Sequence, residues 1–494
     1  MKSMENLSDS LKANIATIKQ SFQLNKELII RMISPPLLEV KKEICMIYLE
    51  TIADKAAIQE HILRPLLQMN EMSAVHPIHD ITNTIEIANI QVIYAMNDLI
   101  SHLTNGKTIV LIDGFNQCLS ADTEDWKDRA FTFPQSQRVL KGPQIGFTEL
   151  AKNNISLIKR CLKNENLVIE EQTIGEETNT SISLMYLADK VDHEILETLR
   201  DRLHSIELSS ILDSSYIEES ISGDQITSFP LVFTTERPDV TSGHVLEGKI
   251  AIVCDGSPNV LIVPALFIQF LQSPEDYYEK SLFEMTRLIR IFSFIVSIYL
   301  IPFYIAFTLF HQELIPSELL INLAAQRQIV PLPVVLEVIV FMLLFQVVLE
   351  SSIRLPTGIT LAFSIIGTLI LGQSAADAGL VQLASLVVVS ATYVLNFAVP
   401  IHPFANSVKM IRFIFVFLAS IFGIYGIMLG TFVLVNHLCS LKSFGVPYLS
   451  PIAPVKTVDL KDTFVRLPLK KIIGTTKKYS KDDLNNNQKN EGNE

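Results

Sequence analysis

The chain has 494 residues, 49% of them hydrophobic, and a formal net charge of -12. Its length is sufficient for about three domains. The acidic balance argues against a nucleic-acid partner, and five cysteines that stand singly argue against both a zinc site and a disulfide framework.

The first 33 residues form a charged N-terminal segment. Asp, Glu and Lys occur throughout it, and it lacks the apolar core of a secretory signal peptide. We therefore expect the aqueous part of the chain to stay in the cytoplasm. Lys280, Arg287 and Arg290 crowd the entry to the first apolar segment and indicate the same side. We expect Arg287 and Arg290 to extend to lipid phosphates there.

Two similar phrases follow the N-terminal segment. Residues 106–114 and 248–256 each place Gly-Lys seven residues before Asp-Gly, with a β-branched run between, which predicts a strand entering a turn. A tyrosine-containing apolar run also precedes each phrase. These repeats predict two related α/β subdomains, at 34–148 and 149–286, with chance similarity as the alternative.

The aqueous part carries no motif for catalysis or cofactor binding. Asp113 and Asp255 could be paired acid and base groups, but aspartate before glycine is more simply a turn residue. Residues 101–108 end like a phosphate-binding loop, yet Ser101 stands where that loop needs glycine. We expect no enzymatic activity, no cofactor and no metal.

The composition changes at about Arg287, and residues 291–310 carry no charge. About 20 apolar residues in a helix span the ~30 Å hydrocarbon core of a bilayer. The fold class predicted is an α/β cytoplasmic domain of two related subdomains, followed by an all-α polytopic membrane domain at 287–440. Its apolar segments are 291–310, 329–349, 357–376, 378–401 and 413–438.

The sequence leaves the topology of these segments in conflict. Lys409 and Arg412 look cytoplasmic, and so does the lysine-containing tail at 441–494. If 413–438 crosses once, the two regions lie on opposite sides. We therefore predict four to five membrane segments, with the third or fourth re-entrant or interfacial. Residues 311–328 predict a short amphipathic helix, and the tail is expected to be disordered after about 477.

The third apolar segment carries small side chains every four residues, at Thr360, Ser364, Thr368, Gly372 and Ala376. Such a stripe permits close packing of membrane helices, or it lines a narrow pore around an axis. Gln373 and Asp377 at its end could then form a polar ring. These residues are the candidate ion pathway, and simple packing is the alternative.

Glu337 lies about one third into the second segment, after Pro331 and Pro333. A carboxylate in hydrocarbon costs several kcal/mol unless it faces protein or water. Two interpretations stay open: an ion-pathway or coupling group, or an interfacial residue, because the prolines delay the helix start to near Val334.

Several phrases resemble those of the GerA family of spore germination proteins, A-subunits of the nutrient germinant receptor. They include residues 235–239, 246–249, 255–258, 273–278, 310–316, 330–333, 354–356 and 443–451. Leu332 and residues 350–353 depart from the family pattern, which puts a charge-based role at the latter turn in doubt. The resemblance covers roughly 35 to 470.

The resemblance implies a multi-pass protein of the spore inner membrane that works with a permease-like B-subunit and a C-subunit lipoprotein. It further implies a homo-oligomeric, ligand-gated channel that releases monovalent cations and contacts membrane lipid. The alternative is a secondary transporter or permease of small nutrients. Transporters usually carry inverted repeats in the membrane, whereas the repeat found here is aqueous.

Overall fold

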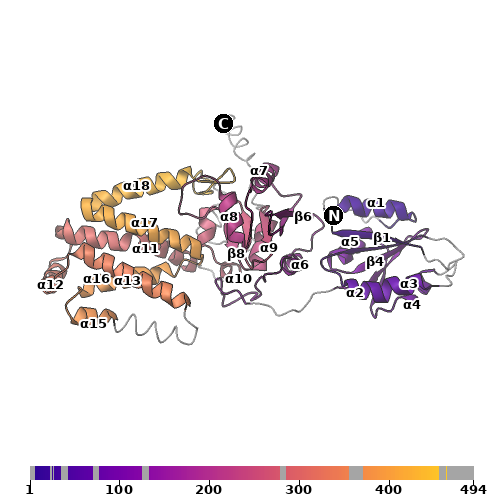
Figure 1. Ribbon diagram of the computed structural model, residues 1–494, viewed down its shortest axis with the longest axis horizontal. Helices are drawn as coiled ribbons and strands as arrows, with labels where there is room; N and C mark the ends of the chain where they lie inside the picture. Colours follow the sequence, from indigo (N-terminus) through magenta and orange to yellow (C-terminus); the bar gives the residue numbers. More distant parts are fainter. Residues whose placement is uncertain are drawn as a thin grey trace.

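The computed structural model describes residues 6–22, 25, 27–34, 43–69, 77–124, 133–278, 285–354, 371–455 and 463. Figure 1 shows three bodies in a row: one sheet subdomain, a second sheet subdomain, and a helical part formed by described residues between 285 and 440. This arrangement confirms the predicted fold class, and the second subdomain is the one that contacts the helices.

The first subdomain is an antiparallel sheet with strand order β1-β2-β4-β5-β3. The strands are β1 (Leu28–Ile33), β2 (Ile44–Leu49), β3 (Ile90–Ile93), β4 (Thr108–Ile112) and β5 (Cys118–Ala121). Successive side chains of a strand point to opposite faces of the sheet. Because the strands carry apolar side chains on both faces, helices cover both faces. One face packs on α1 (Leu11–Ser21) and α5 (Met96–Thr104). The other packs on η1 (Ile58–Leu63), which follows the short α2 (Lys55–Ala57), and on α3 (Arg64–Leu67) and α4 (Pro77–Thr84).

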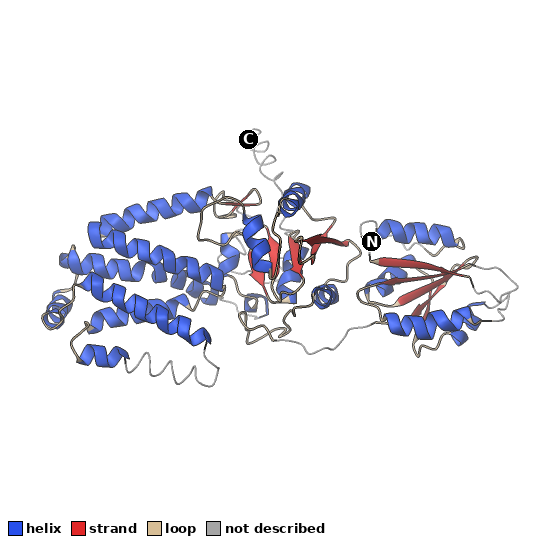
Figure 2. Ribbon diagram, in the orientation of Figure 1, coloured by secondary structure: helices blue, strands red, loops and turns tan. Residues whose placement is uncertain are grey.

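The second subdomain repeats this plan, with strand order β6-β7-β9-β10-β8. The strands are β6 (Leu167–Ile174), β7 (Thr180–Leu187), β8 (Phe233–Thr235), β9 (Ile250–Cys254) and β10 (Val260–Val263). One face packs on α6 (Ala151–Cys161) and α9 (Pro238–Leu246), and the other on α7 (His193–His204) and α8 (Ser214–Ser222). Figure 2 shows each sheet between helices.

The two Gly-Lys phrases occupy equivalent positions, as strands β4 and β9 at the centre of their sheets. Their Asp-Gly turns also make the same contacts. Asp113 Oδ1 accepts from the Leu11 backbone N–H at 3.1 Å, and Asp255 Oδ1 accepts from that of Ala151 at 2.9 Å. Both aspartates therefore cap a helix N-terminus, which supports the turn interpretation over an acid–base pair.

The second subdomain ends with α10 (Glu275–Tyr278), and the helical part begins with the long α11 (Met285–Leu309). It continues through η3 (Gln312–Leu314), α12 (Ser317–Arg327) and α13 (Val334–Arg354). The remaining helices are α15 (Leu371–Asp377), α16 (Leu383–Asn396), α17 (His402–Phe422) and α18 (Ile424–Ser440). The short helix expected at 311–328 is present as α12.

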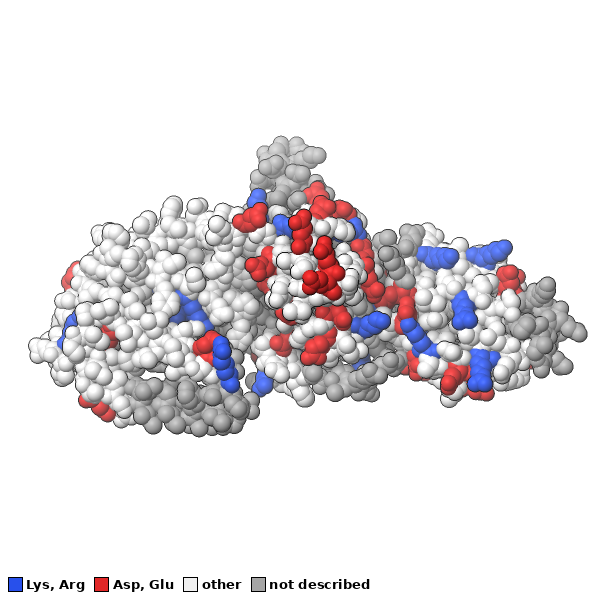
Figure 3. All heavy atoms as spheres, viewed as in Figure 1, with Lys and Arg blue, Asp and Glu red and all other residues white. Residues whose placement is uncertain are grey.

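Three of these helices are long and apolar enough to cross a membrane, at Thr286–Leu309, Val334–Ser352 and His402–Phe422. Helices α16 and α18 are apolar but shorter, with lengths of about 21 and 25 Å at 1.5 Å per residue. Figure 3 shows few charged side chains on the visible face of the helical part, in contrast to the acidic second subdomain.

The expectation of a single apolar segment at 413–438 is wrong. The chain turns at Gly423, which has φ +60°, and α18 returns along α17. A Cβ on Gly426 would lie 2.2 Å from the Leu418 carbonyl oxygen, so only glycine permits this approach. Helix α17 also begins eleven residues before the predicted segment, at His402.

This hairpin resolves the topology conflict. The start of α17 contacts the second subdomain through Ser407, whose hydroxyl donates to the Ser228 carbonyl oxygen. The chain after α18 contacts it too, because the Lys442 backbone N–H donates to Gln225 Oε1 at 3.1 Å. Both regions therefore lie at the end of the bundle that faces the subdomain (Figure 1), and the conflict needs no re-entrant segment.

Candidate functional site

Glu337 lies in the first turn of α13, which begins at Val334 as the interfacial interpretation supposed. Its side chain is nevertheless 1% exposed, and Oε1 accepts from the Gln382 backbone N–H at 2.6 Å. Gln382 is the residue before α16, so the carboxylate lies at the positive end of that helix. The Gln382 side chain in turn donates to the Leu323 carbonyl oxygen at 2.9 Å. Glu337 thus joins α13, α16 and α12.

The other candidate pathway residues are only partly described. Gly372, Gln373 and Asp377 belong to α15, where Gln373 and Asp377 are exposed. No hydrogen bond or ion pair between described residues joins either of them to Glu337. Thr360, Ser364 and Thr368 lie outside the described residues, so the pore stripe stays a prediction.

Arg412 is a buried cation that the sequence interpretation placed at the membrane surface. It lies halfway along α17 and is 0% exposed. Its Nε donates to the Ser297 carbonyl oxygen at 2.7 Å, and Nη2 donates to Asn396 Oδ1 at 3.3 Å. The guanidinium also lies 5.4 Å from the centre of the Tyr393 ring. All these partners are neutral, and they come from α11 and α16.

A salt-bridge latch joins the second subdomain to α11. Asp276 accepts from Arg287 Nε at 3.1 Å and from both Nη atoms of Arg290. Burial alone would raise the pKa of Asp276, but the hydrogen bonds and charges of Arg290 and Arg287 hold it below its ordinary value. Arg287 is 0% exposed. The expectation that these arginines extend to lipid phosphates is therefore wrong, because the carboxylate of Asp276 binds them instead.

A cluster of aromatic rings fills the space beside the latch. Phe404 of α17 lies at its centre, with its ring 5.3 Å from that of Phe267, 5.3 Å from Phe270 and 5.4 Å from Phe294. Phe229 packs on the same ring at 5.7 Å. Because these residues come from the second subdomain, α11 and α17, the cluster makes one continuous hydrophobic core across the junction.

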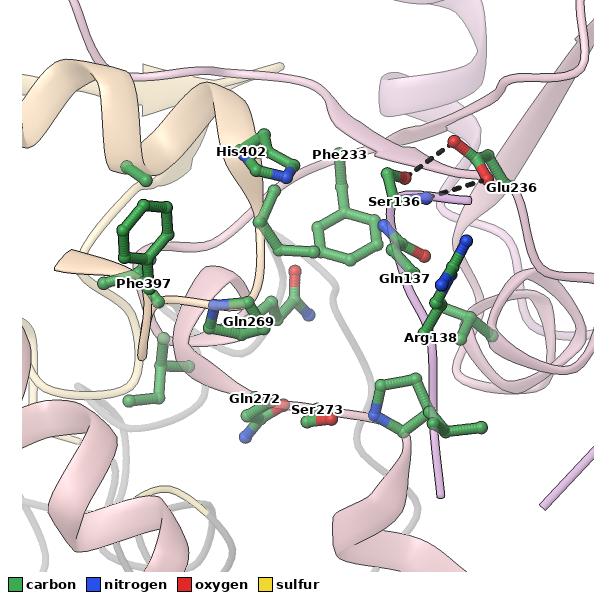
Figure 4. Close-up of a pocket in the computed structure, with 18 of the residues that line it drawn as sticks. Ser136, Gln137, Arg138, Phe233, Glu236, Gln269, Gln272, Ser273, Phe397 and His402 are labelled. Carbon is green, nitrogen blue, oxygen red and sulfur yellow. Dashed lines mark hydrogen bonds between the residues drawn. The ribbon is translucent and has the colours of Figure 1, made fainter. Parts of the chain in front are cut away.

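A cavity of about 1170 Å³, here called the junction cavity, lies between the second subdomain and the helical part. One wall belongs to the second subdomain and includes Phe233 and Gln269. Residues 135–139, which lie on the link between the subdomains, form another. The helices contribute a third, including Asn396 and Lys409. Figure 4 shows Phe397 and His402 on one side and Gln137, Arg138 and Glu236 on the other.

The lining of this cavity connects it to Arg412. Tyr393 and Asn396 line the cavity and also contact the Arg412 guanidinium. A change in the cavity therefore has a direct route to a charge in the middle of a membrane-length helix. The described residues contain no cluster of His, Cys, Asp and Glu that could hold a metal ion.

These features are those of a membrane-associated protein with a tandem sheet domain. Sequence comparisons identify the family to which it belongs. The sequence model described as "Bacillus/Clostridium GerA spore germination protein" matches residues 16–477. The chain therefore belongs to the GerA family of spore germination proteins.

The chain is also similar to individual proteins. The chain is 39% identical to spore germination protein KA of Bacillus subtilis (strain 168), over 94% of this chain and 85% of the relative. It is 36% identical to the uncharacterized membrane protein YfkQ of the same organism, over 86% and 83%. A crystal structure of the N-terminal domain of the A subunit of the Bacillus megaterium spore germinant receptor GerK3 is 31% identical. That match covers 54% of this chain and 99% of the solved chain, with a TM-score of 0.41.

Proposed function

We propose that this protein is the A-subunit of a nutrient germinant receptor in the spore inner membrane, and that it couples nutrient sensing to the release of monovalent cations. The proposed complex contains a permease-like B-subunit and a C-subunit lipoprotein. The A-subunit acts in it as a homo-oligomeric channel. Family membership supports the receptor role, and so does the name of the 39% identical relative, spore germination protein KA.

The observation that carries the channel role is the environment of Arg412. A buried charge in the middle of a membrane-length helix is costly, so it marks a functional position. Its partners on α11 and α16 are neutral, and neutral acceptors hold a guanidinium less tightly than a carboxylate does. Arg412 is therefore suited to change partners when these helices move.

In this proposal the third apolar segment, with Thr360, Ser364, Thr368 and Gly372, lies innermost around the oligomer axis. Gln373 and Asp377 rim one mouth, since rings of acidic side chains select cations. Glu337 couples α13 to α16 through its hydrogen bond to Gln382. Movement of the second subdomain reaches these helices through the latch and the aromatic cluster.

Flux measurements in liposomes test this proposal. The full chain, reconstituted with its B- and C-subunits in potassium-loaded vesicles, should release potassium when a rich nutrient mixture is added. It should show no saturable uptake of the nutrients. Ser364→Trp should block potassium release without lowering the amount of protein inserted. Saturable nutrient uptake without potassium release would instead establish the transporter alternative.

A further inference from the structure

The junction cavity lies at the end of the helical bundle where lipid headgroups are found. Helix α11 begins at this end, α13 ends there, and α17 begins there. The cavity reaches Leu349 and Ser352 in the last turns of α13, and His402 in the first turn of α17. A membrane whose hydrocarbon region surrounds α11, α13 and α17 therefore places its headgroup layer at this level.

The walls of the cavity suit an amphiphile. Leu349, Tyr393 and Phe397 make the side toward the helices apolar, whereas Gln269, Gln272 and Ser273 make the side toward the subdomain polar. Phe397 is 63% exposed, so this wall continues onto the outer surface of the bundle. The volume of about 1170 Å³ also exceeds the ~300–1,000 Å³ typical of pockets for small ligands.

The hydrogen bonds and ion pairs of the lining engage its acidic side chains and leave its basic side chains available to an anion. Its acidic side chains already have partners: Glu236 accepts from the Gln135 backbone N–H at 2.7 Å, and Asp239 accepts from Tyr278 Oη at 2.7 Å. The third acid, Glu247, lies 3.5 Å from His244 Nδ1.

The lysine and the arginine of the lining differ from these acidic side chains in the partners that they have. Lys409 donates to the neutral Asn406 Oδ1 at 3.0 Å, and neither Lys409 nor Arg138 forms an ion pair with a carboxylate of the described residues. The N-terminus of α17 adds the partial positive charge of the helix dipole. The residue before the helix is Ile401, whose side chain cannot accept a hydrogen bond from the first N–H groups of the helix.

From these observations we infer that the junction cavity binds the phosphate headgroup of an anionic phospholipid. Lys409 and Arg138 bind the phosphate, and the first part of an acyl chain lies along Leu349 and Phe397. The occupant is supplied by the surrounding bilayer, because the apolar wall continues onto the lipid-facing surface. This inference requires only that the helices lie in a membrane, and it holds whether or not the protein conducts ions.

Native mass spectrometry of the full chain tests this inference. Protein purified from membranes that contain phosphatidylglycerol and phosphatidylethanolamine should retain one phosphatidylglycerol. The double variant Lys409→Gln/Arg138→Gln should bind it roughly tenfold or more weakly, because each basic side chain near a headgroup contributes to binding. Ser352→Trp, which fills the cavity and leaves the charges intact, should also lose it.

Lys442→Gln is the matched control, because this exposed lysine lies at the same end of the bundle but outside the cavity lining. It should retain the lipid as the unaltered chain does. Equal retention by the double variant and the control, with both folded by thermal melting, would overturn the inference. Displacement of the lipid by inorganic phosphate alone would also overturn it, because the site would then take free anions.

Discussion

Arg412 has an unusual environment for a charged side chain. Its guanidinium is buried among neutral groups of α11 and α16. The desolvation of a buried charge is expensive, and neutral acceptors repay only part of it. Arg412 therefore contributes little to stability, and its presence is better explained by a role in function.

The first prediction follows at this position. Arg412→Leu should change the free energy of unfolding by no more than ~1 kcal/mol, because it removes the cost of burying the charge together with the hydrogen bonds. Thermal melting of the purified protein in detergent measures this. Arg354→Gln, at a residue whose side chain is 78% exposed, is the control. A large loss of stability in Arg412→Leu alone would assign Arg412 a structural role.

Asp276 is expected to behave in the opposite way. Asp276→Asn leaves the buried guanidinium of Arg287 without its carboxylate, which should cost ~3–5 kcal/mol. Asp189→Asn, at an exposed position of the same subdomain, should change stability by at most ~0.5 kcal/mol. Because the pKa of Asp276 is lowered in the folded protein, this stabilisation is complete at neutral pH. It is lost only as the pH falls through that lowered value.

A double replacement provides the check on this explanation. Asp276→Leu combined with Arg287→Met should recover much of the stability that Asp276→Asn loses, since an apolar pair can replace a buried ion pair. Chemical denaturation compares the double variant with Asp276→Asn and with the Asp189→Asn control. If the double variant is as unstable as Asp276→Asn, the latch is not the reason for the loss.

At the scale of elements, the hairpin of α17 and α18 depends on two glycines. Gly423→Ala places a side chain at φ +60° with its Cβ 3.0 Å from the Phe310 ring, which should cost ~1–2 kcal/mol. Gly426→Ala meets the Leu418 carbonyl oxygen and should cost more. Gly243→Ala in α9 meets nothing within 4 Å, so it should stabilise by ~0.5–1 kcal/mol. Equal effects at Gly423 and Gly243 in thermal melts would disprove this account of the turn.

The duplicated strands were predictable because both copies carry the same residue types at the same spacing. A Cβ on Gly106 would lie 2.8 Å from the Ile52 carbonyl oxygen, and one on Gly248 would lie 2.7 Å from that of Lys190. Both copies therefore need glycine at the same place. The hairpin was not predictable in this way, since Gly423 lies inside an unbroken apolar run and hydropathy does not detect a turn there.

The candidate site was predictable only in part. Glu337 stood out because a carboxylate among apolar residues is rare in membrane segments. Arg412 was misplaced because polar residues just before it, including Asn406 and Lys409, resemble a loop. They lie instead on α17, where Asn406 and Lys409 line the junction cavity. The cavity itself is formed by segments more than 300 residues apart in sequence, so no local pattern indicates it.

At the scale of the whole molecule, we expect the hairpin to place the subdomains and the end of α18 on one side of the membrane. In a Cys439→Ser background, Lys442→Cys and the native, exposed Cys161 should react with a membrane-impermeant maleimide from the same side. Glu313→Cys, at the opposite end of α11, should react only from the other side. Labelling of Lys442→Cys together with Glu313→Cys would contradict the hairpin topology.

The whole account joins the sheet subdomains to the helices through the latch, the aromatic cluster and the junction cavity, and it ends at Arg412. Potassium release from intact spores tests this chain of contacts most directly. Spores carrying Arg412→Leu, with normal levels of the protein, should release potassium into rich medium at a rate roughly tenfold or more below that of the unaltered chain. This decrease corresponds to an activation barrier that is higher by ~1.4 kcal/mol or more. Spores carrying Arg354→Gln should be unaffected. Normal potassium release by Arg412→Leu spores that depend on this receptor alone would contradict the account.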